Sequence, residues 1–318
     1  IIMSVALIVV LIFGVETAGG IGAVIHNASE LPGYLSMTLS YDVNTGKAAP
    51  YSALTIVSTA AWGLGYFGMP HILLRFMAIE DEKKLKLSRR VATIWVVISL
   101  FVAVFIGVIG YTMSKVGALE MLTGSNSETI IVKISALLSQ HGVIFALLAG
   151  VILAGILAST MSTSDSQLLA ASSAVSSDIL GAFRKDSSNK NGSMAAARIT
   201  LLVISVVAAF IARNPDSSVF AIVSFAWAGF GAAFGPVVLF SLFWKRTNKW
   251  GALAGMVCGG SMVFIWKYLI RPLGGIWNIY ELLPAFLIAC AAIVIVSLLT
   301  PKPSKEIEEE FDRVAQMK

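Results

Sequence analysis

The chain has 318 residues, of which 57% are hydrophobic and only 13% are charged, and its mean hydropathy is +0.84. A soluble domain carries about 25% charged residues, so this composition excludes an ordinary soluble protein and indicates a polytopic membrane protein. The net charge of +5 is no sign of nucleic-acid binding, because lysine and arginine in a membrane protein chiefly report the orientation of its spans.

The chain begins inside an apolar run that no initiator methionine, basic segment or cleavage site precedes, so we do not expect this run to be a signal peptide. We expect the sequence to be a fragment that lacks an amino-terminal part. Eight apolar stretches are predicted to cross the bilayer as helices: residues 1–23, 51–77, 91–113, 142–178, 198–213, 218–244, 250–270 and 281–300. The predicted fold is all-α, with a transmembrane domain over residues 1–300, a charged tail over 301–318 and no visible strand pattern.

The positive charges predict the orientation of these spans. If the segments after the second, fourth, sixth and eighth stretches share one side, that side carries 17 lysines and arginines and the other side carries 6. The more positive side of a membrane protein faces the cytoplasm. The protein is therefore predicted to lie in the cell (inner) membrane, with the first residues of this chain and its tail in the cytoplasm.

The second stretch is interrupted in its middle by the segment AWGLGYFGMPH, residues 61–71, with three glycines and a proline. Proline removes a backbone donor, and glycine inside a helix costs roughly 1 kcal/mol relative to alanine. In hydrocarbon the freed backbone groups need partners, so a broken helix persists only where it is buried in protein or lines a cavity. The pattern predicts a helix broken near Pro70 and a binding site at the break.

Three residues of this segment could form such a site. Trp62, Tyr66 and Pro70 are spaced i, i+4 and i+8, so on α-helical geometry they share one face. Tryptophan and tyrosine combine a flat apolar surface with one polar group, which suits a small amphipathic solute. A half-helix that starts near Pro70 would also present its positive dipole end to a carboxylate. The residues alone equally allow a second interpretation, in which the two aromatics only pack or lie at the membrane interface.

The fourth stretch contains a second candidate segment, AGILASTMSTSDSQ, residues 154–167. Its small and hydroxyl-bearing residues fall on one helical stripe: Gly155, Ser159, Ser162, Thr163 and Ser166. Hydroxyls offer the hard oxygen ligands that a cation such as Na⁺ prefers. Contact between helices through Ser and Thr is the more favoured interpretation from the residues alone. Asp165 is expected to attract cations electrostatically rather than to coordinate one.

The sixth stretch mixes aromatics, small residues and a proline over residues 224–236, which allows either a gating helix or a kinked packing helix. Cys258 and Cys290 match no metal or redox spacing and are interpreted as reduced core residues. The three histidines also lack metal-ligand spacing. We find no phosphate-binding loop, nucleophile motif or paired carboxylates, so the sequence predicts neither an enzyme nor an organic cofactor.

Three segments resemble the sodium/solute symporter family: GWGLGYFGMPHILLRFMA, AGILASTMSTSDSQLLAASSAVSSDI and SFAWAGFGAAFGPVVLFSLFWKR. The resemblance extends over essentially the whole chain. It implies a broken-helix, inverted-repeat transporter fold and sodium-coupled symport of L-proline into the cell by alternating access. Another small solute, such as pantothenate or a different amino acid, remains an alternative, as does a symporter-like membrane sensor module.

The resemblance also implies roles for individual residues. It indicates Trp62, Tyr66 and Pro70 as solute-binding residues. For the coupling ion Na⁺, it indicates hydroxyl ligands from Ser162 and Thr163 and a backbone carbonyl ligand from Ser159. The remaining sodium ligands would lie on a broken helix that this chain does not contain. The implied partners are therefore L-proline or a similar small solute, Na⁺ and the lipid bilayer.

Overall fold

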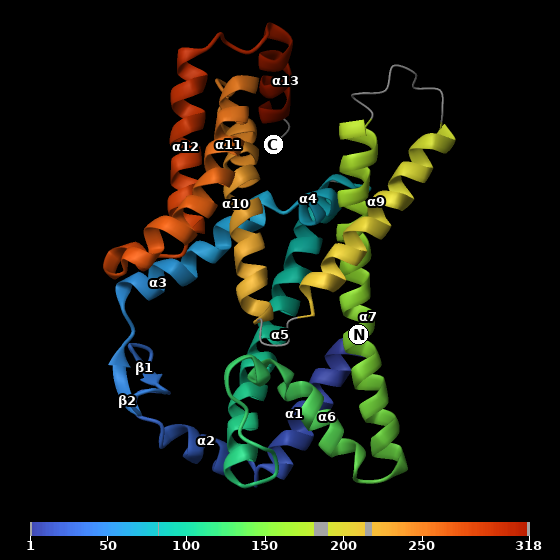
Figure 1. Ribbon diagram of the computed structural model, residues 1–318, viewed down its shortest axis with the longest axis vertical. Helices are drawn as coiled ribbons and strands as arrows, with labels where there is room; N and C mark the ends of the chain where they lie inside the picture. Colours follow the sequence, from blue (N-terminus) through green and yellow to red (C-terminus); the bar gives the residue numbers. More distant parts are fainter. Residues whose placement is uncertain (1, 82, 181–189, 214–217, 317–318) are drawn as a thin grey trace. The chain divides into compact units, whose positions relative to one another are not determined.

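The computed structural model describes residues 2–81, 83–180, 190–213 and 218–316. Helices dominate these residues (Figure 1). The α-helices are α1 (Ile2–Thr17), α2 (Ile21–Ser29), α3 (Ala53–Ala60), α4 (Pro70–Met77), α5 (Lys84–Lys115), α6 (Ile130–Ser139), α7 (Val143–Ser173), α9 (Lys190–Ile211), α10 (Val219–Phe243), α11 (Lys249–Ile265), α12 (Leu282–Leu299) and α13 (Lys305–Gln316). Short 3₁₀ segments are η1 (Ala61–Gly68), η2 (Gly124–Thr129), η5 (Arg271–Leu273) and η6 (Gly275–Asn278), and π-helical turns are η3 (Ala174–Ile179) and η4 (Trp266–Ile270).

Among the described residues, 6 helices are long and apolar enough to cross a membrane. These are Lys84–Lys115, Val143–Ile179, Met194–Ile211, Val219–Phe243, Lys249–Leu273 and Leu282–Leu299. The bent pair α1 and α2 raises the number to 7 if it is one span. The remaining predicted span, residues 51–77, is divided into α3, η1 and α4. The predicted all-α membrane fold is confirmed, with two of the eight predicted stretches broken rather than continuous.

The predicted span over residues 1–23 is not one continuous helix. α1 ends at Thr17 and α2 begins at Ile21, and the apolar helices on either side of this break meet at 77°. Gly19 and Gly20 lie between the two helices and have φ angles of 89° and 93°, respectively. Only glycine adopts this left-handed region at little cost, so the glycine pair ends the helix even though the surrounding residues are apolar.

The sequence shows no strand pattern, but the structure contains two short strands. β1 (Leu39–Asp42) and β2 (Lys47–Pro50) pair as a two-stranded sheet. The carboxylate of Asp42 accepts hydrogen bonds from the backbone N–H of Asn44 and the hydroxyl of Thr45, both at 2.9 Å. Gly46 follows with a φ of 65°. These local bonds form the turn of a hairpin whose strands are too short to show an alternating pattern.

The chain divides into two compact units, residues 1–49 with 79–219 and residues 50–78 with 220–318. This division does not test the predicted separation into a domain over 1–300 and a tail over 301–318, which stays a prediction. Three of the charges used to predict the orientation, Arg184, Lys185 and Lys318, lie outside the described residues.

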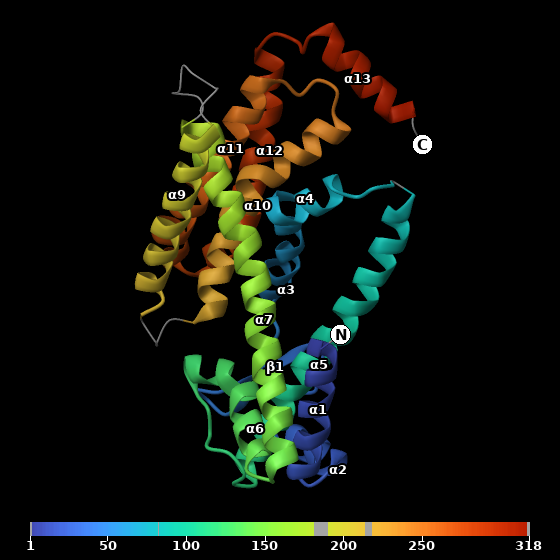
Figure 2. The same cartoon turned by 90° about the vertical axis from the view of Figure 1, so that its right-hand side faces the viewer.

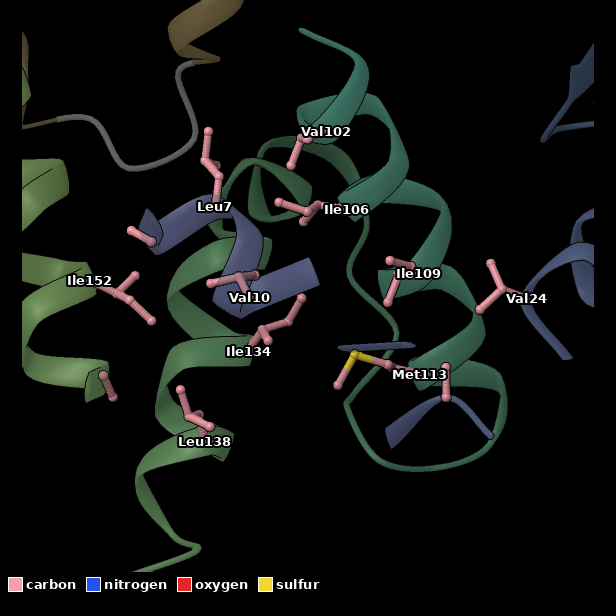
Figure 3. Packing of buried hydrophobic residues seen from close by; sticks show 13 residues of the cluster. Leu7, Val10, Val24, Val102, Ile106, Ile109, Met113, Ile134, Leu138 and Ile152 are labelled. Atoms are coloured by element: carbon pink, nitrogen blue, oxygen red, sulfur yellow. The ribbon is translucent and has the colours of Figure 1, made fainter. Parts of the chain in front are cut away.

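The first unit has its core where α1, α2, α5, α6 and α7 meet (Figure 3). Val10 from α1, Ile109 and Met113 from α5, and Ile134 and Leu138 from α6 are at most 1% exposed. Burying each such side chain contributes about 1.5–3 kcal/mol where the alternative is water. This core packs against the amino-terminal part of α7. The turns of α7 that follow carry the predicted sodium ligands.

In the second unit, α11 and α12 run side by side (Figures 1 and 2). Gly255 makes the contact possible, because a Cβ there would lie 2.4 Å from Cγ1 of Ile293. Asn248 caps α11 by accepting a 2.9 Å hydrogen bond from the N–H of Gly251, and its amide donates to the hydroxyl of Thr300 at 2.7 Å. α10 packs against this pair of helices. It approaches Gly259 so closely that a Cβ added to Gly259 would lie 2.2 Å from the carbonyl oxygen of Ala232 in α10.

Candidate functional site

The predicted break in the second stretch is present. α3 ends at Ala60, the chain continues as the 3₁₀ segment η1, and Met69 is extended with φ −83° and ψ 110°. A residue before proline is driven from the helical region, and proline fits the first position of a new helix because its missing N–H needs no partner there. α4 accordingly begins at Pro70, and the carbonyl of Met69 accepts hydrogen bonds from the N–H groups of Ile72 and Leu73, both at 3.0 Å.

Because η1 has glycines where it faces α10, its backbone can lie in direct contact with that helix. A Cβ on Gly65 would lie 1.9 Å from Nε1 of Trp227, and one on Gly68 would lie 2.2 Å from the carbonyl oxygen of Phe230. From the other side, a Cβ on Gly231 would lie 2.7 Å from Cα of Gly65. No larger residue fits these three positions without a shift of the backbone or of the Trp227 ring.

Five aromatic rings gather around this contact, and we call them the aromatic cluster: Trp62, Tyr66, Phe220, Trp227 and Tyr280. The ring of Trp62 stacks on those of Phe220, Trp227 and Tyr280, with centroids 5.5, 5.6 and 5.9 Å away and interplanar angles of 11°, 16° and 16°. The ring of Tyr66 meets that of Trp227 edge-on at 4.8 Å. Such pairs contribute about 0.5–1.5 kcal/mol each beyond the area they bury.

Three hydrogen bonds connect the cluster to the broken helix and its neighbours. The indole N–H of Trp227 donates to the carbonyl oxygen of Trp62 at 2.9 Å. The hydroxyl of Tyr280 donates to the carbonyl oxygen of Ser224 at 2.6 Å, and its backbone N–H donates to Oγ of Ser58 at 3.1 Å. Partners of this kind are what a broken helix requires in an apolar environment.

The structure brings together two of the three predicted solute residues. Trp62 and Tyr66 both contact Trp227, although η1 is a 3₁₀ helix with three residues per turn, so the shared α-helical face predicted for them does not form. Tyr66 is 50% exposed, whereas the Trp62 ring is half-buried among its three partners. Pro70 lies beyond the extended residue, at the start of α4.

Three members of the cluster were not predicted as site residues: Phe220, Trp227 and Tyr280. Trp227 belongs to the segment 224–236 that the sequence singles out as a possible gating helix, so a signal for it existed. Tyr280 lies 222 residues from Ser58 along the chain and in a connection between helices, where no local pattern marks it.

The segment 224–236 forms part of α10, which is helical throughout with Pro236 inside it. Its small residues are buried: Ala228, Gly231, Ala232, Gly235 and Pro236 itself. This favours the packing interpretation for that face of the helix. The gating interpretation stays a prediction.

The predicted sodium ligands lie on one continuous stretch of α7 in the first unit. The hydroxyl of Thr163 donates to the carbonyl oxygen of Ser159 at 3.3 Å, so these two oxygens are adjacent on the helix surface. Ser159, Ser162, Thr163 and also Asp165 are exposed. Hydroxyls bonded to the carbonyl of residue i−4 leave oxygen lone pairs pointing away from the helix, and these oxygens could bind a hard cation. In the described part of the chain no cluster of His, Cys, Asp and Glu could hold a metal ion.

Comparison with known proteins identifies what the chain resembles. A family model described as the sodium:solute symporter family matches residues 1–259. The osmoregulated proline transporter OpuE of Bacillus subtilis is 37% identical over 304 residues, which cover 96% of this chain and 58% of that protein. A sodium/proline symporter of Haemophilus influenzae is 41% identical over 262 residues, 82% of this chain and 51% of that protein. One of Escherichia coli is 39% identical over 259 residues, 81% of this chain and 50% of that protein. The chain thus spans about half the length of the curated relatives it matches.

Proposed function

The chain belongs to the sodium:solute symporter family, and we propose that it forms the part of a sodium-coupled L-proline symporter that carries the broken helix and the hydroxyl stripe. The observation that carries this proposal is the helix broken at Met69 and lined by Trp62 and Tyr66. Relatives named proline transporters or sodium/proline symporters, 37–41% identical to this chain, support the choice of solute.

L-proline matches the chemistry at the break. Its pyrrolidine ring offers an apolar face to the exposed ring of Tyr66, and its secondary ammonium group is a cation that an aromatic face attracts. Its carboxylate would be stabilised by the positive end of the dipole of α4, which begins at Pro70. Trp62 would take part from within the aromatic cluster rather than as a free ring, because its neighbours already lie against it.

Sodium would bind on α7. The hydroxyls of Ser162 and Thr163 and the backbone carbonyl of Ser159 are the proposed ligands, and the adjacency of the Thr163 and Ser159 oxygens supports this set. Sodium bound there would raise the affinity for proline, and proline would raise the affinity for sodium by the same factor, since coupling free energy is reciprocal. Release of both into a cytoplasm low in sodium would complete a cycle of alternating access.

The orientation is part of the proposal. The side with more lysine and arginine would face the cytoplasm, which places the tail with α13 inside the cell. Transport of a solute and an ion requires no bond to be made or broken, and the proposed role needs no organic cofactor.

The test uses the complete product of the gene that encodes this chain, purified and reconstituted in proteoliposomes. An inward sodium gradient should drive accumulation of labelled L-proline above equilibrium, while a matched potassium gradient, or a sodium gradient collapsed by an ionophore, should not. Unlabelled amino acids and pantothenate added outside would rank competing solutes. Equal proline uptake in the sodium and potassium gradients would overturn the proposal.

A further inference from the structure

Tyr280 occupies an unusual position in the second unit. It lies two residues before the start of α12, is only 8% exposed, and contacts three separate elements. Its backbone N–H donates to Ser58 on α3, its hydroxyl donates to the carbonyl of Ser224 on α10, and its ring stacks on Trp62 of η1. A residue that contacts the helix before the break, the break itself and the helix opposite the break can fix all three relative to one another.

The stacking of Tyr280 on Trp62 is the contact that connects Tyr280 to the proposed solute site. Of the three rings stacked on Trp62, two come from α10 and Tyr280 comes from the connection between α11 and α12. A ring held between partners from different elements loses most of its freedom to rotate about χ1 and χ2. The orientation of Trp62 therefore depends on where the connection places Tyr280.

The connection itself is held by an ion pair. Nη1 of Arg271 lies 2.7 Å from Oε2 of Glu281, whose side chain is only 2% exposed, and Nε of Arg271 donates to Oδ1 of Asn278 at 3.0 Å. Between them, Gly274 and Gly275 turn the chain with φ angles of 73° and 59°. Because Glu281 follows Tyr280 directly, this pair fixes the residue next to the ring. Burial raises the pKa of Tyr280, so its hydroxyl stays protonated and able to donate at physiological pH.

We propose that Tyr280 is a positioning residue for solute binding: it fixes the orientation of the Trp62 ring and thereby sets the affinity for the solute, without contacting the solute itself. The inference rests on the proposed function for the identity of the solute. It adds a residue outside the broken helix and outside the α7 stripe, in a connection that follows α11.

The first measurement needs no ligand. The complete gene product is labelled with 5-fluorotryptophan, and the ¹⁹F resonance of Trp62 is assigned by its loss in Trp62→Phe. Ring currents from stacked neighbours shift this resonance, so Tyr280→Leu should move it strongly, whereas Tyr280→Phe, which keeps the ring but loses the hydroxyl bond to Ser224, should move it less. The matched control is Trp277→Leu, which removes a 44% exposed aromatic of the same connection that packs on Trp266.

The second measurement is proline uptake in proteoliposomes. Tyr280→Leu should raise the KM for proline roughly 10-fold, the loss expected from one aromatic pair, and Tyr280→Phe should raise it about 3-fold through the lost hydrogen bond. The sodium concentration for half-activation, measured at saturating proline, and the maximal rate should stay within about twofold in both variants, because the proposed sodium ligands on α7 are unchanged. A variant that merely folds poorly would lower the maximal rate and leave both constants unchanged.

The outcomes separate the two proposals. If the Trp62 resonance is unchanged in Tyr280→Leu, or if it moves but the KM for proline does not, the positioning role is overturned. If the unmodified protein shows no sodium-driven proline uptake, the proposed function fails, and the fluorine resonance alone then decides whether Tyr280 orients Trp62. A moved resonance together with a raised KM in Tyr280→Leu, and neither change in Trp277→Leu, supports the inference.

Discussion

The indole N–H of Trp227 donates a 2.9 Å hydrogen bond to the backbone carbonyl of Trp62, and the two indole rings stack with their centroids 5.6 Å apart. One side chain of α10 thus satisfies a carbonyl of the broken helix and also supports the side chain of the same residue. A break in a membrane helix costs backbone hydrogen bonds, and here a neighbouring helix replaces one of them. The same replacement fixes a ring at the proposed solute site.

Trp227→Phe should separate the hydrogen bond to the Trp62 carbonyl from the stacking on the Trp62 ring. The phenyl ring keeps part of the stacking on Trp62 but has no N–H, so the carbonyl of Trp62 loses its partner. A buried acceptor left without a partner costs about 1–3 kcal/mol, and we expect a lower thermal unfolding midpoint for the purified protein in detergent. Trp250→Phe, on a 50% exposed indole of α11, is the control and should leave the midpoint unchanged. Equal midpoints for the two variants would show that the hydrogen bond contributes little.

Gly65 and Gly63 offer a matched pair of substitutions two residues apart. A Cβ on Gly65 would lie 1.9 Å from Nε1 of Trp227, whereas a Cβ on Gly63 would meet nothing within 4 Å. Gly65→Ala must displace the Trp227 ring and should destabilise the protein by about 1–3 kcal/mol, as overpacking does, and raise the KM for proline. Gly63→Ala should be neutral or slightly stabilising, because alanine has the higher helix propensity. If both variants transport proline like the unmodified protein, the close approach of η1 to α10 is not needed for transport.

The break at the site could be predicted from the sequence because its causes are local. Pro70 excludes the helical conformation at Met69 and starts α4, and both effects act between neighbouring residues. The hydroxyl stripe on α7 followed equally from helical spacing. For both sites the chemical roles of the residues stay predictions, since the structure gives their placement and not their ligands.

The parts that could not be predicted depend on contacts between distant residues or on single local bonds. Tyr280 joins the cluster through Ser58, 222 residues away, and no sequence periodicity connects them. The Gly19–Gly20 break was missed because average hydropathy is insensitive to two residues with positive φ. The hairpin of β1 and β2 was missed because its turn depends on one carboxylate, that of Asp42.

Loss of the ion pair between Arg271 and Glu281 should lower the free energy of unfolding far more than loss of the exposed ion pair between Lys84 and Glu80. Arg271→Leu leaves the buried carboxylate of Glu281 without its cation. Because the Arg271 side chain is 39% exposed, we expect a loss below the ~3–5 kcal/mol that removing one partner of a fully buried pair costs. Lys84→Leu removes the cation from the exposed pair with Glu80, at 2.8 Å, and should cost less than about 1 kcal/mol. Denaturation midpoints of both variants test this. Glu281→Gln added to Arg271→Leu should recover much of the loss, and a failure to recover it would point to lost packing of the arginine instead.

The hairpin should loosen in acid. The N–H of Asn44 and the hydroxyl of Thr45 hold the pKa of Asp42 below its ordinary value. A carboxyl with a depressed folded-state pKa stabilises the fold above its ordinary pKa, and this contribution is lost as the pH falls through the folded-state pKa. Amide exchange across residues 39–50, corrected for intrinsic rates and followed by mass spectrometry, should therefore speed up below about pH 4. Asp42→Ala should already exchange fast at neutral pH and respond little to acid, and protection that persists in acid in the unmodified hairpin would contradict the role of Asp42.

The proposed division between ion and solute sites makes opposite predictions for α7 and η1. Ser162→Ala and Thr163→Ala each remove one hydroxyl oxygen from the proposed sodium site, and a bond to a charged group contributes about 1.5–3 kcal/mol, so the sodium concentration for half-activation should rise roughly 10-fold or more. Trp62→Ala should instead raise the KM for proline at saturating sodium.

Thr160→Ala is the matched control on α7, since the hydroxyl of Thr160 donates to the carbonyl of Ile156 at 3.0 Å but the residue is outside the proposed ligand set. It should change neither constant, and Thr163→Ser, which keeps the hydroxyl, should retain most of the sodium response. Because sodium and proline affinities are reciprocally coupled, each constant must be measured with the other ligand saturating. If the α7 variants and Trp62→Ala then alter both constants to the same extent, the residues do not divide into an ion site and a solute site.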